Sequence, residues 1–193
     1  TVGHGLSSAP EMIWVKNTSD ADNWCVYCKT GGVIDETDFL RLDATMAVVD
    51  DADRWNDTAA TSSVFTVDTD NQVNGSSDEM IAYCWHSVSG YSKIGSYSGD
   101  GTSDGSTVIS CGFRPAWVMI KCINDTESWW VWDNVRNPFT NTQYRTAMNS
   151  ESTETSNVST SADNITFTST GFALTGSGGG SNQNGNTYIF MAF

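Results

Sequence analysis

One stretch of sequence occurs twice in this chain, and this repetition constrains the fold more than any other feature. The first version runs from Gly5 to Tyr27 and the second from Gly112 to Trp132. Each contains a proline, an apolar run that ends in a lysine, a polar turn and a tryptophan. The matched residues, each pair separated by 105 positions, are Pro10 and Pro115, Lys16 and Lys121, and Trp24 and Trp129. A constant offset across three residue types indicates an internal duplication.

Each version is predicted to form a β-hairpin. The proline fixes the backbone at the start of an extended run. The Asn, Asp, Ser and Thr residues that follow the run supply a turn, and the strand that begins at the tryptophan returns. In the first version, residues 12–16 are apolar on both sides of the predicted strand. We therefore expect this strand to be buried on both faces.

The duplication continues towards the end of each copy. Residues 63–67 match residues 164–168, and residues 80–85 match residues 188–193, whereas the middle of each copy does not align. A constant framework with a variable middle is typical of a scaffold that carries variable loops. The first residues, Thr1-Val2, parallel Thr107-Val108, so the sequence is expected to begin inside a framework strand of a longer or processed protein.

The pattern of elements predicts an all-β fold. Many short strands are joined by polar turns, and no long segment has helical periodicity. The best helical candidate, residues 38–49, fits a strand followed by a loop. We expect a β-sandwich built from two internally duplicated antiparallel repeats, either in tandem or merged into one larger sandwich. The expected parts are a first repeat at 1–97, a Gly/Ser/Asp junction at 98–106 and a second repeat at 107–193.

Four tryptophans on the predicted framework are expected to anchor the core. They are Trp14, Trp24, Trp117 and Trp129. Each indole ring can bury a large apolar area, and an aromatic residue that follows strand periodicity usually packs inside. The alternative is that these rings form a platform on which sugars stack.

The charge balance excludes some classes of partner. The net charge is −14, from 9 Lys+Arg against 23 Asp+Glu. Nucleic-acid binding needs a basic footprint, and anionic membranes attract basic segments, so we expect neither partner. No apolar run approaches the ~20 residues of a membrane span. Only 17% of the residues are charged, below the usual ~25%, and this composition favours an extracellular or virion-surface protein.

No set of residues predicts catalysis. The sequence contains two histidines but no G-x-S-x-G motif, the turn that presents the nucleophilic serine in many hydrolase triads. Glu36 and Asp38 have the spacing of paired carboxylates on a strand, but they occupy an acidic turn. Cys25 and Cys28 form a C-x-x-C pair without the second pair of a zinc site, and they are interpreted as small apolar fillers. We therefore expect a protein that is not an enzyme.

Two groups of loop aspartates are the candidate binding residues. They are Asp50, Asp51, Asp53, Asp57, Asp100 and Asp104. Hard oxygen ligands in loops suit calcium, although the full EF-hand spacing is missing. A glycan is the other candidate ligand, and solvated acidic loops are the alternative without any ligand. No other cofactor is expected.

Several further motifs occur in order along the chain: Thr1-Val2-Gly3-His4-Gly5, Ile81-Ala82-Tyr83-Cys84-Trp85, Gly112-Phe113-Arg114-Pro115 and Arg136-Asn137-Pro138. With them, nearly the whole chain resembles an uncharacterised repeat domain of bacteriophage virion proteins, mostly tail-fibre or structural proteins. Cys28 stands where the family pattern has a histidine, which weakens any metal site built on it. The family has no established catalytic residues to carry over. The resemblance implies an exposed virion appendage or surface module, often oligomeric.

Three functions remain open. The first is a non-enzymatic virion structural module, in a tail fibre or a capsid-attached fibre, that acts in assembly or host attachment. The second is an extracellular carbohydrate-binding module, with a host surface glycan as the partner. The third is a self-assembling extracellular filament subunit that pairs through its sheet edges. The apolar strands at both ends of the sequence predict a homo-oligomer, a trimer in a fibre or a helical array in a filament.

Overall fold

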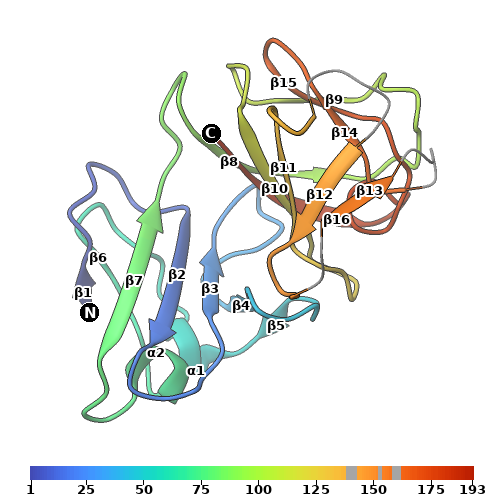
Figure 1. Ribbon diagram of the computed structural model, residues 1–193. Coiled ribbons are helices and arrows are strands. Elements are labelled where there is room, and N and C mark those ends of the chain that lie inside the picture. Colours follow the sequence, from blue (N-terminus) through green and yellow to red (C-terminus); the bar gives the residue numbers. More distant parts are fainter. Residues whose placement is uncertain (138–142, 152–153, 158–161) are drawn as a thin grey trace. The chain divides into compact units, whose positions relative to one another are not determined.

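The computed structural model describes residues 1–137, 143–151, 154–157 and 162–193. The chain divides into two compact units, Thr1–His86 and Ser87–Phe193, which are considered one at a time (Figure 1). Antiparallel strands make up most of the regular structure in both units. Among the described residues, the helices are two segments of four residues each. The expected all-β, sandwich-like fold is therefore confirmed.

The first unit is built on a five-stranded sheet with the order β5-β4-β3-β2-β7, and a second sheet pairs β1 with β6. Its elements are β1 (Val2–Gly3), β2 (Met12–Asn17), β3 (Cys25–Cys28), β4 (Asp38–Arg41), β5 (Val49–Asp50), α1 (Ala52–Trp55), β6 (Val64–Phe65), α2 (Asn71–Asn74) and β7 (Met80–Trp85). The segment 38–49 is a strand followed by a loop that leads into β5, as expected.

The second unit has a six-stranded sheet with the order β13-β12-β11-β10-β16-β8 and a three-stranded sheet with the order β14-β15-β9. Its elements are β8 (Lys93–Ser98), β9 (Val108–Ser110), β10 (Trp117–Cys122), β11 (Trp130–Asp133), β12 (Gln143–Ala147), β13 (Thr155–Asn157), β14 (Ile165–Phe167), β15 (Gly171–Leu174) and β16 (Thr187–Ala192).

The duplication that the sequence indicates is visible in the strand pairing. Met12 pairs with Cys28 across the first hairpin, and Trp117 pairs with Asp133 across the second, again with the offset of 105 positions. β2 lies between β3 and β7, and β10 lies between β11 and β16. The two main sheets therefore share strand order and register, apart from β8, which extends the second one.

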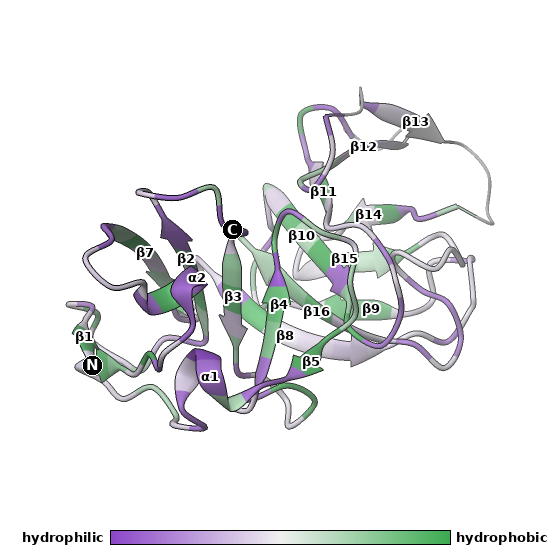
Figure 2. Ribbon diagram, turned by 90° about the horizontal axis from the view of Figure 1, so that it is seen from below, coloured by the Kyte–Doolittle hydropathy of each residue, from purple (hydrophilic) through white to green (hydrophobic). Residues whose placement is uncertain are grey.

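Each unit has its own core on one face of its main sheet. In the first unit, β2 and β3 direct alternate side chains towards α1, β6 and α2, and the buried cluster comprises Ile13, Val15, Cys25, Tyr27, Phe39, Trp55, Phe65 and Val73. In the second unit, residues of β10 and β16 pack against residues of β14 and β15. Many strand residues are hydrophobic, whereas the loops range mostly from neutral to hydrophilic (Figure 2). β10 is mainly buried along both faces. β2 is buried along its core face, but on the other face Met12 is buried and Trp14 and Lys16 are half-buried, so the expected burial of both faces is met only in part.

Two expectations about the repeats need correction. The division between the units lies after His86, not in the 98–106 segment, because β8 pairs along its whole length with β16 of the second unit. The match of residues 63–67 with 164–168 is also wrong. β6 pairs with β1 as β15 pairs with β9, so β6 takes the place of β15, not of β14.

Candidate binding face

The first unit carries a row of aromatic side chains on the sheet face opposite its core. Because strand residues alternate between faces, Ile13 and Val15 enter the core while Trp14 points the other way. The ring of Trp14 contacts Trp85 at 4.5 Å between centroids, Trp85 contacts Tyr83 at 6.0 Å, and Tyr83 contacts Trp24 at 6.1 Å. We call these four residues the aromatic ladder.

The sheet register explains how these four rings meet. Trp14 pairs with Tyr83 across β2 and β7, and Trp85 lies two residues further on the same face of β7. Trp24 immediately precedes β3, on the other side of β2. Tyr83 is 43% exposed, and the three tryptophans are half-buried. Such partly exposed, contiguous rings can stack against the apolar face of a sugar or another aromatic group.

The second unit does not repeat the ladder. The positions equivalent to Trp14 and Tyr83 hold Met119 and Met191, as the paired register shows. Trp117 contacts Phe193 at 5.9 Å between ring centroids, and Phe193 contacts Tyr91 at 6.1 Å, which is a different set of three rings. The ladder is therefore specific to the first unit, although the underlying sheet is duplicated.

The predicted core anchors are only partly confirmed. Trp129 is fully buried, at 0% exposure, but Trp14, Trp24 and Trp117 are half-buried. Trp24 and Trp129 occupy matched positions in the duplication, but they are not equally buried, because Trp24 belongs to the ladder. Trp55 and Trp132 are fully buried tryptophans of the two cores that the sequence analysis did not single out as anchors. Trp55 comes from the short helix α1, for which no periodic signal exists.

Tyr83 and Trp85 are the site residues that sequence reasoning missed. Residues 81, 83 and 85 are all large and apolar, in strict alternation along β7. This period-two pattern predicts one apolar strand face. Because the intervening residues are also apolar, the pattern did not indicate which face remains exposed.

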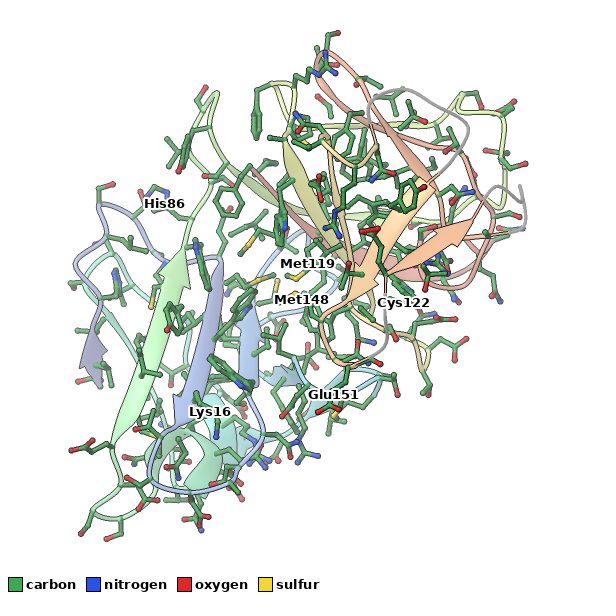
Figure 3. The ribbon with its side chains drawn as sticks, in the orientation of Figure 1. Lys16, His86, Met119, Cys122, Met148 and Glu151 are labelled. Carbon is green, nitrogen blue, oxygen red and sulfur yellow. The ribbon has the colours of Figure 1, made fainter. Side chains whose placement is uncertain are left out.

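The duplicated lysines close the two hairpin turns. Lys16, at the end of β2 (Figure 3), donates from Nζ to the carbonyl oxygens of Asn17 at 2.7 Å and Asp22 at 2.8 Å. Lys121 donates from Nζ to the carbonyl oxygen of Glu127 at 2.7 Å. Glu127 lies 105 positions after Asp22, so the same bond is made in both units. The repeated lysine is therefore a structural part of the hairpin.

The first group of candidate aspartates lies around the short helix α1. Asp51 is its N-cap and accepts a hydrogen bond from the backbone N–H of Asp53 at 3.1 Å. Asp51 also lies 3.6 Å from the guanidinium of Arg54, which forms an ion pair with Asp70 as well. Asp50 ends β5, and Asp57 follows the left-handed residue that closes the helix. The Asp51 carboxylate thus serves helix capping and ion pairing.

The second group holds the loop that follows β8. Asp100 accepts hydrogen bonds from the N–H and the hydroxyl of Thr102, both at 2.8 Å, from the hydroxyl of Thr107, and from Asn182 at 3.1 Å. These donors hold its pKa well below the ordinary value. Asp104 accepts from the N–H of Ser106 at 2.9 Å. Within the described part of the chain, no three His, Cys, Asp or Glu side chains form a group that could hold a metal ion.

The residues considered for catalysis or metal binding are held in structural contacts as well. Glu36 forms an ion pair with Lys29, and this pair lowers the pKa of Glu36, whereas burial raises the pKa of Asp38. Cys25 and Cys28 point to opposite faces of β3, and burial raises the pKa of both thiols, that of Cys25 to about 12. A thiol with a raised pKa is a poor nucleophile and metal ligand. These two cysteines therefore act as apolar fillers.

Neither of the short helices found in the described residues is long and apolar enough to cross a membrane. No curated protein and no solved structure matches the chain. One family model matches it over residues 1–193, and its description is a domain of unknown function, DUF7483. Since the match covers every residue of the sequence, the chain belongs to the DUF7483 family.

Proposed function

We propose that this chain is a non-enzymatic structural module of a bacteriophage virion, in a tail fibre or a capsid-attached fibre, that acts in assembly or host attachment. The observation that carries the proposal is an edge strand that pairs on one side only, among the residues that the structure describes. β7 ends the main sheet of the first unit, and it exposes Ile81 and Tyr83, at 40% and 43%. An exposed apolar edge strand is a template for pairing with another chain.

Two further observations support an assembly role. The duplicated sheet provides two rigid copies of one framework in a single chain. The sequence also resembles phage virion proteins over nearly its whole length, through motifs that include residues 81–85 of the edge strand. The module then belongs at the virion surface, with other copies of itself as its main partner.

Sedimentation-velocity ultracentrifugation of the purified chain at micromolar concentration tests this function. We expect a concentration-dependent homo-oligomer, because each copy presents the same edge. Electron microscopy of the same sample then separates a discrete virion-type assembly from an extracellular filament. A monomer at all concentrations would argue against an assembly module.

The aromatic ladder favours a second candidate function, carbohydrate binding at a host surface. Aromatic rings on a sheet face can stack against pyranose rings, and Tyr83 and the half-buried tryptophans form a continuous row. A glycan array with the wild-type chain and the Tyr83→Ala variant tests it. Trp117→Ala is the matched control, because Trp117 is half-buried outside the ladder. Binding that Tyr83→Ala abolishes and Trp117→Ala retains would favour this function.

A further inference from the structure

The two main sheets differ at one edge. In the second unit, β8 pairs antiparallel with β16 over six residues, from Thr187 with Ser98 to Ala192 with Lys93. In the first unit, β7 occupies the position of β16, but among the described residues of the chain the only strand that pairs with it is β2. The second unit thus shows which type of partner this edge accepts, namely an antiparallel strand.

The hydrogen-bond pattern identifies the backbone groups at the open edge. The N–H of Thr18 donates to the carbonyl of Glu79 at 2.8 Å, and the N–H of Ile123 donates to the carbonyl of Thr187 at 2.9 Å, so the equivalent bond is made in both units. Hydrogen-bonded positions alternate along an antiparallel pair. Ile81 and Tyr83 therefore bond towards β2, while the N–H and C=O groups of Ala82 face the open edge.

We infer that β7 pairs antiparallel with β7 of a second copy of this chain, about a two-fold axis at Ala82. This inference rests on the proposed assembly function and specifies its interface. In such a pair, Ile81 of one copy lies opposite Tyr83 of the other, so the two exposed apolar side chains cover each other. The contact is isologous and gives a dimer, not the trimer or helical array expected from the sequence alone.

Side-chain size at the edge of β7 allows a second copy of β7 as the partner strand, because this edge does not require the glycine that β8 provides to β16. β8 carries Gly95 opposite Phe190, and a Cβ atom on Gly95 would lie 2.6 Å from the Phe190 ring. The first unit has Ala82 at the position of Phe190, so its edge does not need a glycine in the partner strand. Two alanines can lie opposite each other across a two-fold axis without a clash.

β7 itself places no charge in the inferred interface. β7 contains no charged residue, and no lysine or proline protects its edge. Asp78 and Glu79 precede the strand, and His86 follows it. In the antiparallel pair about Ala82, Glu79 of one copy lies opposite Trp85 of the other and Asp78 lies opposite His86, so no two carboxylates lie directly opposite each other.

The variant Ala82→Pro tests the edge directly. Proline removes the outward N–H of Ala82 but no hydrogen bond between β7 and β2. We expect the dissociation constant of the dimer to rise about tenfold or more, with the melting temperature little changed. Ser96→Pro is the matched control, because Ser96 lies on β8, the outer strand of the other sheet. If Ala82→Pro fails to fold, Ile81→Lys provides the same test through charge repulsion between the copies.

A disulfide test identifies the partner strand. Hydrogen-bonded residues directly opposite each other have Cα atoms about 5.5 Å apart, which a disulfide can span. The double variant Ala82→Cys, Cys84→Ser should form a covalent dimer under mild oxidation, and Ser96→Cys, Cys84→Ser should not.

An oligomer that survives both Ala82→Pro and Ile81→Lys would overturn this interface while leaving the assembly function intact. A wild-type monomer would overturn both. The inference would also be overturned if Ala82→Pro disrupts the dimer but the Ala82→Cys, Cys84→Ser variant does not cross-link, because β7 would then pair with a different strand.

Discussion

The two duplicated lysines make the same bond to a turn carbonyl, but burial separates them. Lys121 is 0% exposed, and burial lowers the pKa of its ammonium from 10.5 to about 8. Between pH 8 and pH 10.5, Lys121 is protonated in the unfolded chain and largely deprotonated in the folded chain. Its contribution to the free energy of unfolding therefore rises with pH over this range. Below about pH 8 both states are protonated, and the full cost of burying the charge is present.

The variant Lys121→Met should lack this pH-dependent contribution. Between pH 7 and pH 10, the wild type should gain up to roughly 3 kcal/mol of stability relative to the variant. Denaturant titrations of both proteins at several pH values measure the difference. The comparison is needed because buried thiols such as Cys111, whose pKa rises to about 11, make stability fall in the same range. A difference that does not change with pH would contradict the burial argument.

The paired tryptophans make a second prediction at the residue scale. Trp129 is fully buried, so Trp129→Ala should cost about 3–5 kcal/mol through lost contacts and a residual cavity. Trp24 occupies the same position in the duplication but is half-buried, so Trp24→Ala should cost clearly less. Urea unfolding of both variants tests the ranking. Equal losses would mean that burial does not decide the contribution of these rings.

At the scale of elements, the sequence predicted the hairpins well and the edges poorly. The matched proline, lysine and tryptophan specified β2 with β3 and β10 with β11, because a hairpin depends on neighbouring residues. The assignment of β8 depends on pairing with β16, about ninety residues away, which local patterns do not report. The helices α1 and α2 were missed because four residues are too few for a periodic signal.

The β8 edge gives a prediction about packing between elements. Gly95→Ala would place a Cβ atom 2.6 Å from the Phe190 ring, so the ring or the strand must move. Overpacking of this kind typically costs about 1–3 kcal/mol. Ser96→Ala is the control on the neighbouring residue, which does not pair with Phe190. Thermal unfolding compares the two, and a melting temperature unchanged by Gly95→Ala would show that β8 adapts without strain.

At the scale of the whole molecule, the candidate site shows the limit of local reasoning. The ladder joins Trp14 and Trp24 with Tyr83 and Trp85, which are remote in the sequence, and only the sheet register brings them together. The acidic loops were visible in the composition, but their capping bonds depend on partners such as Asn182, far along the chain from Asp100. The sequence shows where charged residues cluster along the chain, whereas the fold decides which groups those charges bind.

The net charge of −14 leads to a prediction about assembly. Two copies repel each other through this charge, whereas the six residues of β7 at the inferred interface are uncharged. Salt screens the long-range repulsion, since the Debye length falls to about 10 Å at 0.1 M, and it has little effect on apolar and backbone contacts. Raising the salt concentration from about 0.02 M to about 0.2 M should therefore strengthen dimerisation several-fold in sedimentation equilibrium. Dimerisation that weakens with salt would instead indicate an interface held by ion pairs, and β7 could not then be its centre.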